Sequence, residues 1–228
     1  VAMCAATNVT GALLPIAEVT RMAHAAGALM LVDAAQTAGW IDIDVSALDV
    51  DLLAFAGHKG PQAPWGIGGL YVAPRVEMRS PRLDQPASMV GYCDTGSVDR
   101  LALAGLVAGL EWLAEPARRD RLAQARAVID RIAAFASGLS QVTLHGPRRS
   151  SARMPTLALS WARRSAGDIA EALRERGVLV SGGRQCAPLA HRSLGTAEHG
   201  VVRLSAGPQA TMEQAERACE ALAQLQHP

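Results

Sequence analysis

The amino-acid sequence predicts an α/β fold in which a mostly parallel sheet is followed by a smaller α+β domain. Three short runs are almost continuously apolar, the pattern typical of strands covered on both faces: residues 1–6, 28–32 and 51–55. A helical segment separates the first two runs, and a strand–helix–strand order implies parallel strands joined by a right-handed crossover. Beyond Leu101 the pattern changes to long helices and then to strands interspersed with helices.

The segment between the first two predicted strands carries the signals of an amphipathic helix. Pro15 stands near its first turn, where the missing N–H costs nothing, and Gly27 follows its end. Its apolar positions are spaced so that they share one face: Ile16, Val19, Met22 and Ala23. That shared face predicts the buried side of the helix.

The later part of the chain is predicted to contain both helices and strands. Helical patterns cover residues 101–113 and 117–139, with Pro116 between them. Further helices are predicted over residues 168–176 and 212–225. The predicted strands of this part occupy residues 142–145, 156–161, 178–181 and 201–205.

These elements predict the organisation of the chain. The apolar run at Val1 reads as a buried strand, so we expect the sequence to begin partway through a large domain. We predict a partial large domain over residues 1–100, connecting helices over residues 101–139 and a small C-terminal domain over residues 140–228.

The composition argues against several classes of protein. Lysine plus arginine number 22 against 21 acidic residues, and this net charge of +1 indicates neither a nucleic-acid partner nor an anionic membrane. No apolar run reaches the roughly 18 residues of a membrane span. The four cysteines, at positions 4, 93, 186 and 219, form no CxxC pair. We therefore expect no metal centre and no disulfide framework, and reduced thiols in the cytoplasm.

A carboxylate directly follows the second predicted strand, in the run Asp33-Ala34-Ala35-Gln36. Ligands of open parallel sheets bind outside the carboxyl ends of the strands, so Asp33 stands where it would meet one. A carboxylate there suits a pyridine ring, because pairing with the protonated nitrogen keeps such a cofactor an electron sink. An ordinary helix N-cap is the alternative for this aspartate.

A lysine follows the next predicted strand, in the run Gly57-His58-Lys59-Gly60. An amine desolvated at the end of a buried strand is a nucleophile and a proton carrier near neutral pH. Glycines on both sides allow the backbone to approach a ligand closely. An exposed loop lysine is the alternative. Because Asp33 and Lys59 follow successive strands, we expect them to face one crevice.

Three motifs in a fixed order resemble the class V aminotransferase group of pyridoxal-phosphate enzymes, which have fold type I. They are residues 7–11 (TNVTG), 32–36 (VDAAQ) and 57–59 (GHK). Within that group the chain is similar to the cysteine desulfurases, from Asn8 to the helix after Arg203. The resemblance implies the C-terminal part of a fold type I transferase.

The resemblance implies a role for each polar residue of these motifs. Lys59 would hold pyridoxal 5′-phosphate as a Schiff base and carry protons as general base and acid. Asp33 would pair with the pyridine nitrogen, and Gln36 would hydrogen-bond the phenolic oxygen. His58 would contact the phosphate, and Asn8 would lie over the cofactor and help orient the substrate carboxylate.

Two residues of the C-terminal part bear on the substrate. Arg203 lies in an apolar run and matches the group's arginine for the substrate carboxylate, which a guanidinium grips through two parallel bonds; a surface arginine is the alternative. Cys186 lies in a glycine-bearing loop, with Arg184 and His191 near enough in sequence to favour a thiolate. Residues 186–191 (CAPLAH) resemble the desulfurases in which this cysteine takes sulfur from the substrate.

Together the motifs predict a cysteine desulfurase that converts L-cysteine to L-alanine and leaves a persulfide on Cys186. A sulfur-acceptor protein is the expected further partner. A selenocysteine lyase, or another class V aminotransferase or lyase, is the alternative with the same cofactor. Ser97, in residues 94–97 (DTGS), resembles the segment through which a neighbouring subunit touches the phosphate, and this implies a homodimer.

Two departures from the family pattern affect this prediction. Ala56 stands where the family usually has a hydroxyl that bonds the phosphate, a charge-assisted bond worth about 2 kcal/mol. The family's N-terminal portion, which precedes the strand before Asn8, has no counterpart in this sequence. A truncated, non-catalytic homologue is therefore the alternative from another class, and we expect the chain to be inactive in isolation.

Overall fold

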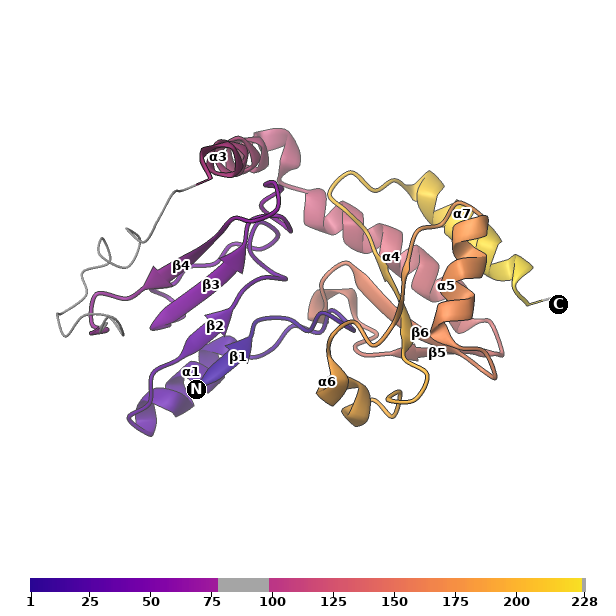
Figure 1. The fold of residues 1–228 in the computed structure, drawn as a ribbon, viewed down its shortest axis with the longest axis horizontal. Coiled ribbons are helices and arrows are strands. Elements are labelled where there is room, and N and C mark those ends of the chain that lie inside the picture. The colour runs from indigo at the N-terminus through magenta and orange to yellow at the C-terminus, as the bar shows by residue number, and fades with distance from the viewer. Residues whose placement is uncertain (78–98, 227–228) are drawn as a thin grey trace. The chain divides into compact units, whose positions relative to one another are not determined.

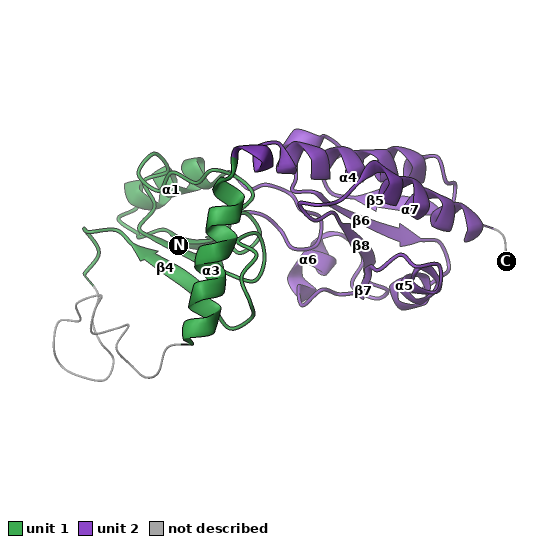
Figure 2. Ribbon diagram, turned by 90° about the horizontal axis from the view of Figure 1, so that it is seen from above, with its two compact units in different colours: residues 1–5, 15–115 green, residues 6–14, 116–228 purple. Residues whose placement is uncertain are grey.

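The computed structural model describes residues 1–77 and 99–226, which gather into two compact units (Figure 2). The first comprises Val1–Ala5 and Pro15–Glu115, and the second comprises Ala6–Leu14 and Pro116–Pro228. The short segment Ala6–Leu14 therefore has its contacts with a part of the chain that comes much later in the sequence.

The first unit is built on a sheet whose described strands are β1 (Ala2–Cys4), β2 (Leu31–Asp33), β3 (Leu52–Ala56) and β4 (Gly68–Val72), in that spatial order (Figure 1). β1, β2 and β3 run parallel, whereas β4 pairs antiparallel with β3. The predicted α/β class and the mostly parallel sheet are confirmed. The sequence does not predict β4, because its glycines read as a turn. In fact a Cβ on Gly69 would lie 2.4 Å from the Phe55 ring, so this pairing needs a glycine.

Helix α1 (Ile16–Ala25) joins β1 to β2 and covers part of the sheet core. Its buried residues are Ile16, Thr20 and Ala23. The prediction that Met22 belongs to this face is wrong, because its side chain is 65% exposed. Thr20 is buried instead, and its hydroxyl donates to the Ile16 carbonyl oxygen at 2.8 Å. That bond satisfies the polar group within the helix and makes its burial possible.

A buried carboxylate anchors the start of β3. Asp51 is fully buried and accepts hydrogen bonds from the Met30 N–H at 2.6 Å, the Arg75 Nε at 2.7 Å and the His24 Nε2 at 2.8 Å. Burial raises the pKa of Asp51, but these donors outweigh it and lower the pKa to about 2. The charged side chain thus ties the residue before β2 to the start of β3.

Two glycines bring the turn after β2 into contact with the turn after β3. A Cβ on Gly60 would lie 1.9 Å from the Ala38 carbonyl oxygen, and a Cβ on Gly39 would lie 2.3 Å from the Gly60 carbonyl carbon. Gly39 also has a φ of +78°, which an L side chain rarely adopts. Neither position can accept a side chain without separating the two turns.

The second unit contains a separate sheet with the order β5-β6-β8-β7, in which all neighbours are antiparallel. Its strands are β5 (Val142–His145), β6 (Thr156–Trp161), β7 (Ser181–Gly183) and β8 (Val201–Ser205). Its helices are α4 (Arg121–Ser137), α5 (Ala166–Glu175), α6 (Pro188–Ser193) and α7 (Met212–Gln224), with short 3-10 turns at Pro116–Arg118 and Ser150–Ala152. The predicted α+β character of this part is confirmed.

Helices α4 and α7 pack side by side, and α4 also contacts β5 and β6 (Figures 1 and 2). Helix α5 contacts β7 and β8. Two details differ from the prediction. β7 begins at Ser181 rather than at residue 178, and α6 forms where only a loop is expected. Pro188 favours that short helix, since proline fits the first helical turn.

The segment Ala6–Leu14 is an integral part of the second unit. Val9 is fully buried and packs against Val201 of β8. The Gly11 carbonyl oxygen accepts a hydrogen bond from the Met154 N–H at 2.8 Å. These contacts fix the backbone around position 8, where a functional side chain is predicted.

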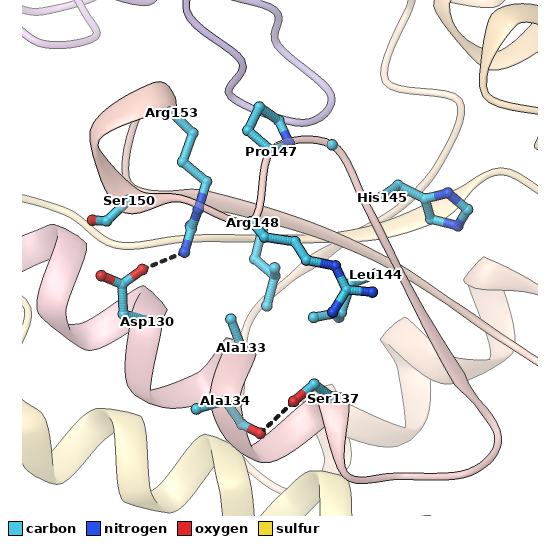
Figure 3. A pocket seen from close by; sticks show the side chains of 12 residues that line it. Asp130, Ala133, Ala134, Ser137, Leu144, His145, Pro147, Arg148, Ser150 and Arg153 are labelled. Atoms are coloured by element: carbon cyan, nitrogen blue, oxygen red, sulfur yellow. Dashed lines mark hydrogen bonds and ion pairs between the residues drawn. The ribbon is translucent and has the colours of Figure 1, made fainter.

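A cavity of about 260 Å³ lies in the second unit, between α4 and the segment that follows β5. Figure 3 shows the side chains that line it. One wall is an ion pair between the buried Arg153 and Asp130 of α4. Burial lowers the pKa of Arg153, and the Asp130 carboxylate offsets part of that effect. None of the residues predicted to bind cofactor or substrate lines this cavity.

Helix α3 (Arg100–Ala114) presents several large apolar side chains to solvent: Leu101, Leu103, Val107 and Leu110. Its opposite side is packed closely, since a Cβ on Gly109 would lie 2.2 Å from the Pro61 carbonyl oxygen. Despite its apolar character this helix is too short to cross a bilayer. None of the helices in the described residues has both the length and the hydropathy for that.

The Asp51 network predicts a specific loss of stability in acid. A carboxylate whose pKa is depressed by folding stabilises the protein above its unfolded value near 3.8, and this contribution is lost as the pH falls to about 2. We expect the loss to be on the order of 2 kcal/mol, measured by urea unfolding between pH 5 and pH 2. Asp51→Asn should be less stable at neutral pH and should lack this part of the acid dependence. Asp42→Asn, at an exposed position, is the matched control.

The contact between Gly39 and Gly60 predicts that Gly60→Ala is poorly tolerated. The added methyl group would overlap the Ala38 carbonyl, so the free energy of unfolding should fall by about 2 kcal/mol in urea denaturation. Gly207→Ala is the matched control, because a Cβ there would meet no atom within 4 Å. Equal stability of the two variants would show that the turns are not held by this contact.

Candidate active site

Asp33, the last residue of β2, presents its carboxylate at the carboxyl end of the parallel strands. The side chain is exposed, and its Oδ1 accepts a hydrogen bond from the Ala35 N–H at 2.9 Å. Within the described residues its second oxygen has no hydrogen-bond partner. The residue therefore caps a turn, not a helix as the alternative interpretation expects, and still has an oxygen available for a ligand.

Lys59 lies in the turn that follows β3, at the same edge of the sheet as Asp33. Its backbone is fixed, because its carbonyl oxygen accepts hydrogen bonds from the Gln62 N–H at 3.0 Å and from the Gln62 side chain at 2.7 Å. The side chain is half-buried, and its ammonium group makes no ion pair in the part of the chain that the structure describes. The turn is thus rigid while the amine remains available.

Two further residues of the first unit belong to these turns. Gln36 is half-buried in the turn after β2, and the described residues provide no partner for its side-chain amide. The His58 ring stacks on Trp65, with the centroids 4.7 Å apart and the planes at 8°. Trp65 was not predicted from the sequence, where its only signal is an aromatic residue between Pro64 and Gly66. In the structure its side chain is exposed.

The polar groups of the first unit form a coherent donor and acceptor set. A carboxylate such as that of Asp33 can pair with a protonated ring nitrogen, and the Gln36 amide can donate to an oxygen anion. A half-buried primary amine such as that of Lys59 can form a Schiff base with an aldehyde. The parallel strands and the glycine contact explain why residues of different turns gather at one edge of the sheet.

Arg203 lies on β8 in the second unit and is half-buried. Its Nη1 donates to the Asn8 carbonyl oxygen at 2.7 Å, whereas its buried Nε has no partner among the described residues. Burial lowers the pKa of Arg203, but a guanidinium remains a cation at neutral pH. No carboxylate pairs with it in the described parts of the chain. A half-buried cation of this kind is suited to the carboxylate of a ligand.

Asn8 connects Arg203 to the loop that carries Cys186. The Asn8 side-chain amide donates to the Gln185 carbonyl oxygen at 2.7 Å. Cys186 is the next residue and lies, as predicted, in a loop, here the one between β7 and α6; its side chain is exposed. Gln185 and Cys186 both have a left-handed backbone, with φ of +43° and +56°. For residues other than glycine each such conformation costs on the order of 1 kcal/mol, so other contacts must maintain it.

His191 does not lie where sequence proximity to Cys186 suggests. Its ring is fully buried, and the two nitrogens contact Thr196 Oγ1 at 2.8 Å and Gln185 Oε1 at 3.2 Å. The imidazole therefore contacts Gln185, the residue before Cys186. Gln185 was not selected from the sequence either; two of its partners, Asn8 and Val201, are distant along the chain.

The predicted site residues thus fall into two groups, each described within its own unit. Asp33, Gln36, His58 and Lys59 belong to the first unit, and Asn8, Cys186 and Arg203 belong to the second. Ser97, predicted to contact the phosphate of a neighbouring subunit, lies outside the described residues. The described residues contain no group of three or more histidine, cysteine, aspartate or glutamate side chains that could hold a metal ion.

Comparisons with known proteins show which proteins this chain is similar to. A cysteine desulfurase from Enterobacter sp. is 32% identical over 203 residues, covering 82% of this chain and 49% of the relative. A probable cysteine desulfurase from Pyrococcus abyssi is 28% identical over 201 residues, covering 79% of this chain and 48% of the relative. The chain therefore spans about half the length of the curated relatives that it matches.

Solved structures lead to the same family. The apo cysteine desulfurase from Thermococcus onnurineus superimposes with a TM-score of 0.86 at 26% identity, covering 98% of this chain and 59% of that one. The cysteine desulfurase CsdA from Escherichia coli gives a TM-score of 0.84 at 25% identity, with 98% and 58% covered. The model of the family "Aminotransferase class-V" matches residues 1–218. With its mostly parallel sheet and its lysine at the carboxyl end of β3, this chain belongs to the class V aminotransferase family.

Proposed function

We propose that the protein is a pyridoxal-phosphate-dependent cysteine desulfurase, which converts L-cysteine to L-alanine and receives the sulfur on Cys186. One observation carries this proposal furthest. An exposed thiol follows a residue, Gln185, that Asn8 connects directly to the half-buried Arg203. A cation for the substrate carboxylate, Arg203, and the residue before the nucleophile for its sulfur are thereby both hydrogen-bonded to Asn8. The names of the curated relatives support the same reaction.

Pyridoxal phosphate fits the polar groups of the first unit. The free oxygen of Asp33 suits the pyridinium nitrogen, the Gln36 amide suits the phenolic oxygen, and the Lys59 amine suits the aldehyde. When bound, the cofactor supplies an electron sink for the carbon next to the substrate nitrogen. We assign the phosphate contact to His58, whose ring orientation is restricted by stacking on Trp65.

Lys59 and Arg203 have complementary tasks in this proposal. Arg203 grips the substrate carboxylate through its guanidinium N–H groups and fixes the orientation of the substrate. Lys59 removes the proton from the substrate Cα as general base and later returns a proton to carbon as general acid. The rigid turn around Gln62 keeps the Lys59 backbone fixed during both transfers.

Cys186 carries out the sulfur transfer. Its thiolate attacks the substrate sulfur, an S–S bond forms, and the Cβ–S bond of the substrate breaks. The electron pair of that bond remains on carbon, which takes up a proton and leaves as alanine. The products are one alanine and one persulfide on Cys186, so that no external oxidant or reductant is required.

The partners of the reaction are also proposed from the resemblance. The persulfide on an exposed loop is accessible to a sulfur-acceptor protein. The segment of residues 94–97, which includes Ser97, resembles the family segment that contacts a neighbouring subunit's cofactor. We therefore propose a homodimer with shared sites.

Replacement of the thiol tests the proposed chemistry. In the full-length protein loaded with pyridoxal phosphate, Cys186→Ser should abolish both alanine formation and the persulfide, while the absorbance band of the bound cofactor persists. Cys219→Ala is the matched control, because that thiol is buried in α7. Its alanine production should equal that of the wild-type protein.

The Lys59→Ala variant completes this test, since it should lose the Schiff-base band itself. Wild-type protein that binds the cofactor and yet produces no alanine from L-cysteine would contradict the proposal. A comparison of rates on L-selenocysteine identifies a selenocysteine lyase. Wild-type protein without any cofactor band would indicate a non-catalytic homologue.

Arg203→Lys tests the carboxylate contact. A lysine keeps the charge but cannot form two parallel hydrogen bonds, so we expect the KM for L-cysteine to rise about tenfold with a smaller change in kcat. Arg192→Lys, at an exposed position on α6, is the control and should leave both constants unchanged. An unchanged KM in Arg203→Lys would remove Arg203 from the substrate site.

A further inference from the structure

The backbone at Cys186 is held in an unfavourable conformation. Gln185 and Cys186 are consecutive residues with φ of +43° and +56°, and neither is glycine. Two such residues in succession persist only where surrounding contacts over-determine them. The direction of the Cys186 side chain therefore depends on whatever holds these two residues in place.

The Gln185 side chain is fixed by acceptors on two strands. Its Nε2 donates to the Ser181 carbonyl oxygen at 3.3 Å and to the Val201 carbonyl oxygen at 3.0 Å. Because both partners are carbonyl oxygens, the nitrogen of the amide must face them. The Oε1 atom consequently faces the other way, toward the His191 Nε2 at 3.2 Å.

This orientation determines the role of the His191 ring. Gln185 Oε1 can only accept, so His191 carries a proton on Nε2 and donates it. In the neutral ring Nδ1 is then an acceptor, and the Thr196 hydroxyl at 2.8 Å donates to it. The fully buried ring thus has a defined tautomer, and both of its nitrogens are engaged.

The other side of the loop is anchored by packing. Ala187, which follows Cys186, packs with Ala190 of α6 against the buried Val9 and Val201. The backbone N–H of Ala187 donates to the Arg184 carbonyl oxygen at 2.9 Å. Cys186 is therefore followed by Ala187, which packs against the core, and preceded by Gln185, whose side-chain amide is hydrogen-bonded. Only the Gln185 amide contacts the His191 side chain; Ala187 is bonded to the His191 backbone, whose N–H donates to the Ala187 carbonyl oxygen at 3.1 Å.

We propose that His191 is a positioning residue for Cys186: through Gln185 it maintains the left-handed backbone that directs the thiol toward the substrate sulfur. This inference rests on the proposed desulfurase function. A satisfied core histidine would stabilise the unit in general. His191 differs because its Nε2 donates to the side chain of the residue adjacent to the nucleophile.

Three variants separate positioning from general stability. His191→Gln retains an N–H donor that reaches Gln185, whereas His191→Leu fills similar space and donates nothing. Thr196→Val removes only the bond to Nδ1 and is the matched control. Each is compared with wild type in the full-length protein loaded with pyridoxal phosphate, and its thermal melting temperature is recorded alongside.

The kinetic readout is the rate of alanine and persulfide formation. We expect kcat of His191→Leu to fall at least about tenfold with KM nearly unchanged, because a misplaced nucleophile slows the chemical step rather than binding. His191→Gln should recover most of kcat, and Thr196→Val should remain close to wild type. Equal losses in the Leu and Gln variants, in proportion to their melting temperatures, would overturn the proposal in favour of a structural role.

Hydrogen exchange provides a readout that does not depend on catalysis. In His191→Leu, the Ala187 amide, which donates to the Arg184 carbonyl oxygen, should exchange about tenfold faster, the factor expected for loss of one buried hydrogen bond. Exchange in α7 should stay unchanged, and His191→Gln should resemble wild type. Unaltered exchange in His191→Leu would overturn the positioning role. Absence of alanine from the wild-type protein would instead overturn the desulfurase function, while the exchange experiment would still test the contact.

Discussion

The parallel pairing of β2 with β3 is the interaction on which the first unit depends. It places Asp33 opposite Ala54, so that the turns after both strands leave the sheet at one edge. The buried Asp51 ties β3 to the residue before β2 at one end of the pair, and two glycines hold the turns together at the other. The chemistry proposed for Lys59 needs this scaffold, because an amine can react with an aldehyde only where the ring is also held.

Much of this edge could be predicted from the sequence, because its determinants are local. Apolar runs identify buried strands, and polar residues directly after two such runs must share an edge if the strands are parallel. The same reasoning failed where a particular side-chain contact, which spacing alone does not show, decides the outcome. Met22 fits the apolar face of α1 by spacing, yet Thr20 is buried there because its hydroxyl bonds within the helix. β4 escaped prediction because its glycines accommodate the Phe55 ring.

In the second unit the sequence pointed to the side chains proposed to react, but not to the residues that orient them. Cys186 and Arg203 stand out by residue type and by their resemblance to family motifs. Gln185 does not, since its partners Asn8, His191 and Val201 come from three separate parts of the chain. The left-handed backbone at positions 185 and 186 has no local signal, as neither residue is glycine. Such a conformation is imposed by tertiary contacts, which no local pattern reveals.

The segment Ala6–Leu14 gives the chain an interleaved order, since it leaves the first unit after Ala5 and returns to it at Pro15. Proteolysis near Pro116 would therefore not release an independent C-terminal domain. The released fragment would lack Val9, which fills part of its core, and the Gly11 carbonyl that pairs with Met154. Gene fusions or domain exchanges are subject to the same restriction, because a folded second unit must include the segment Ala6–Leu14.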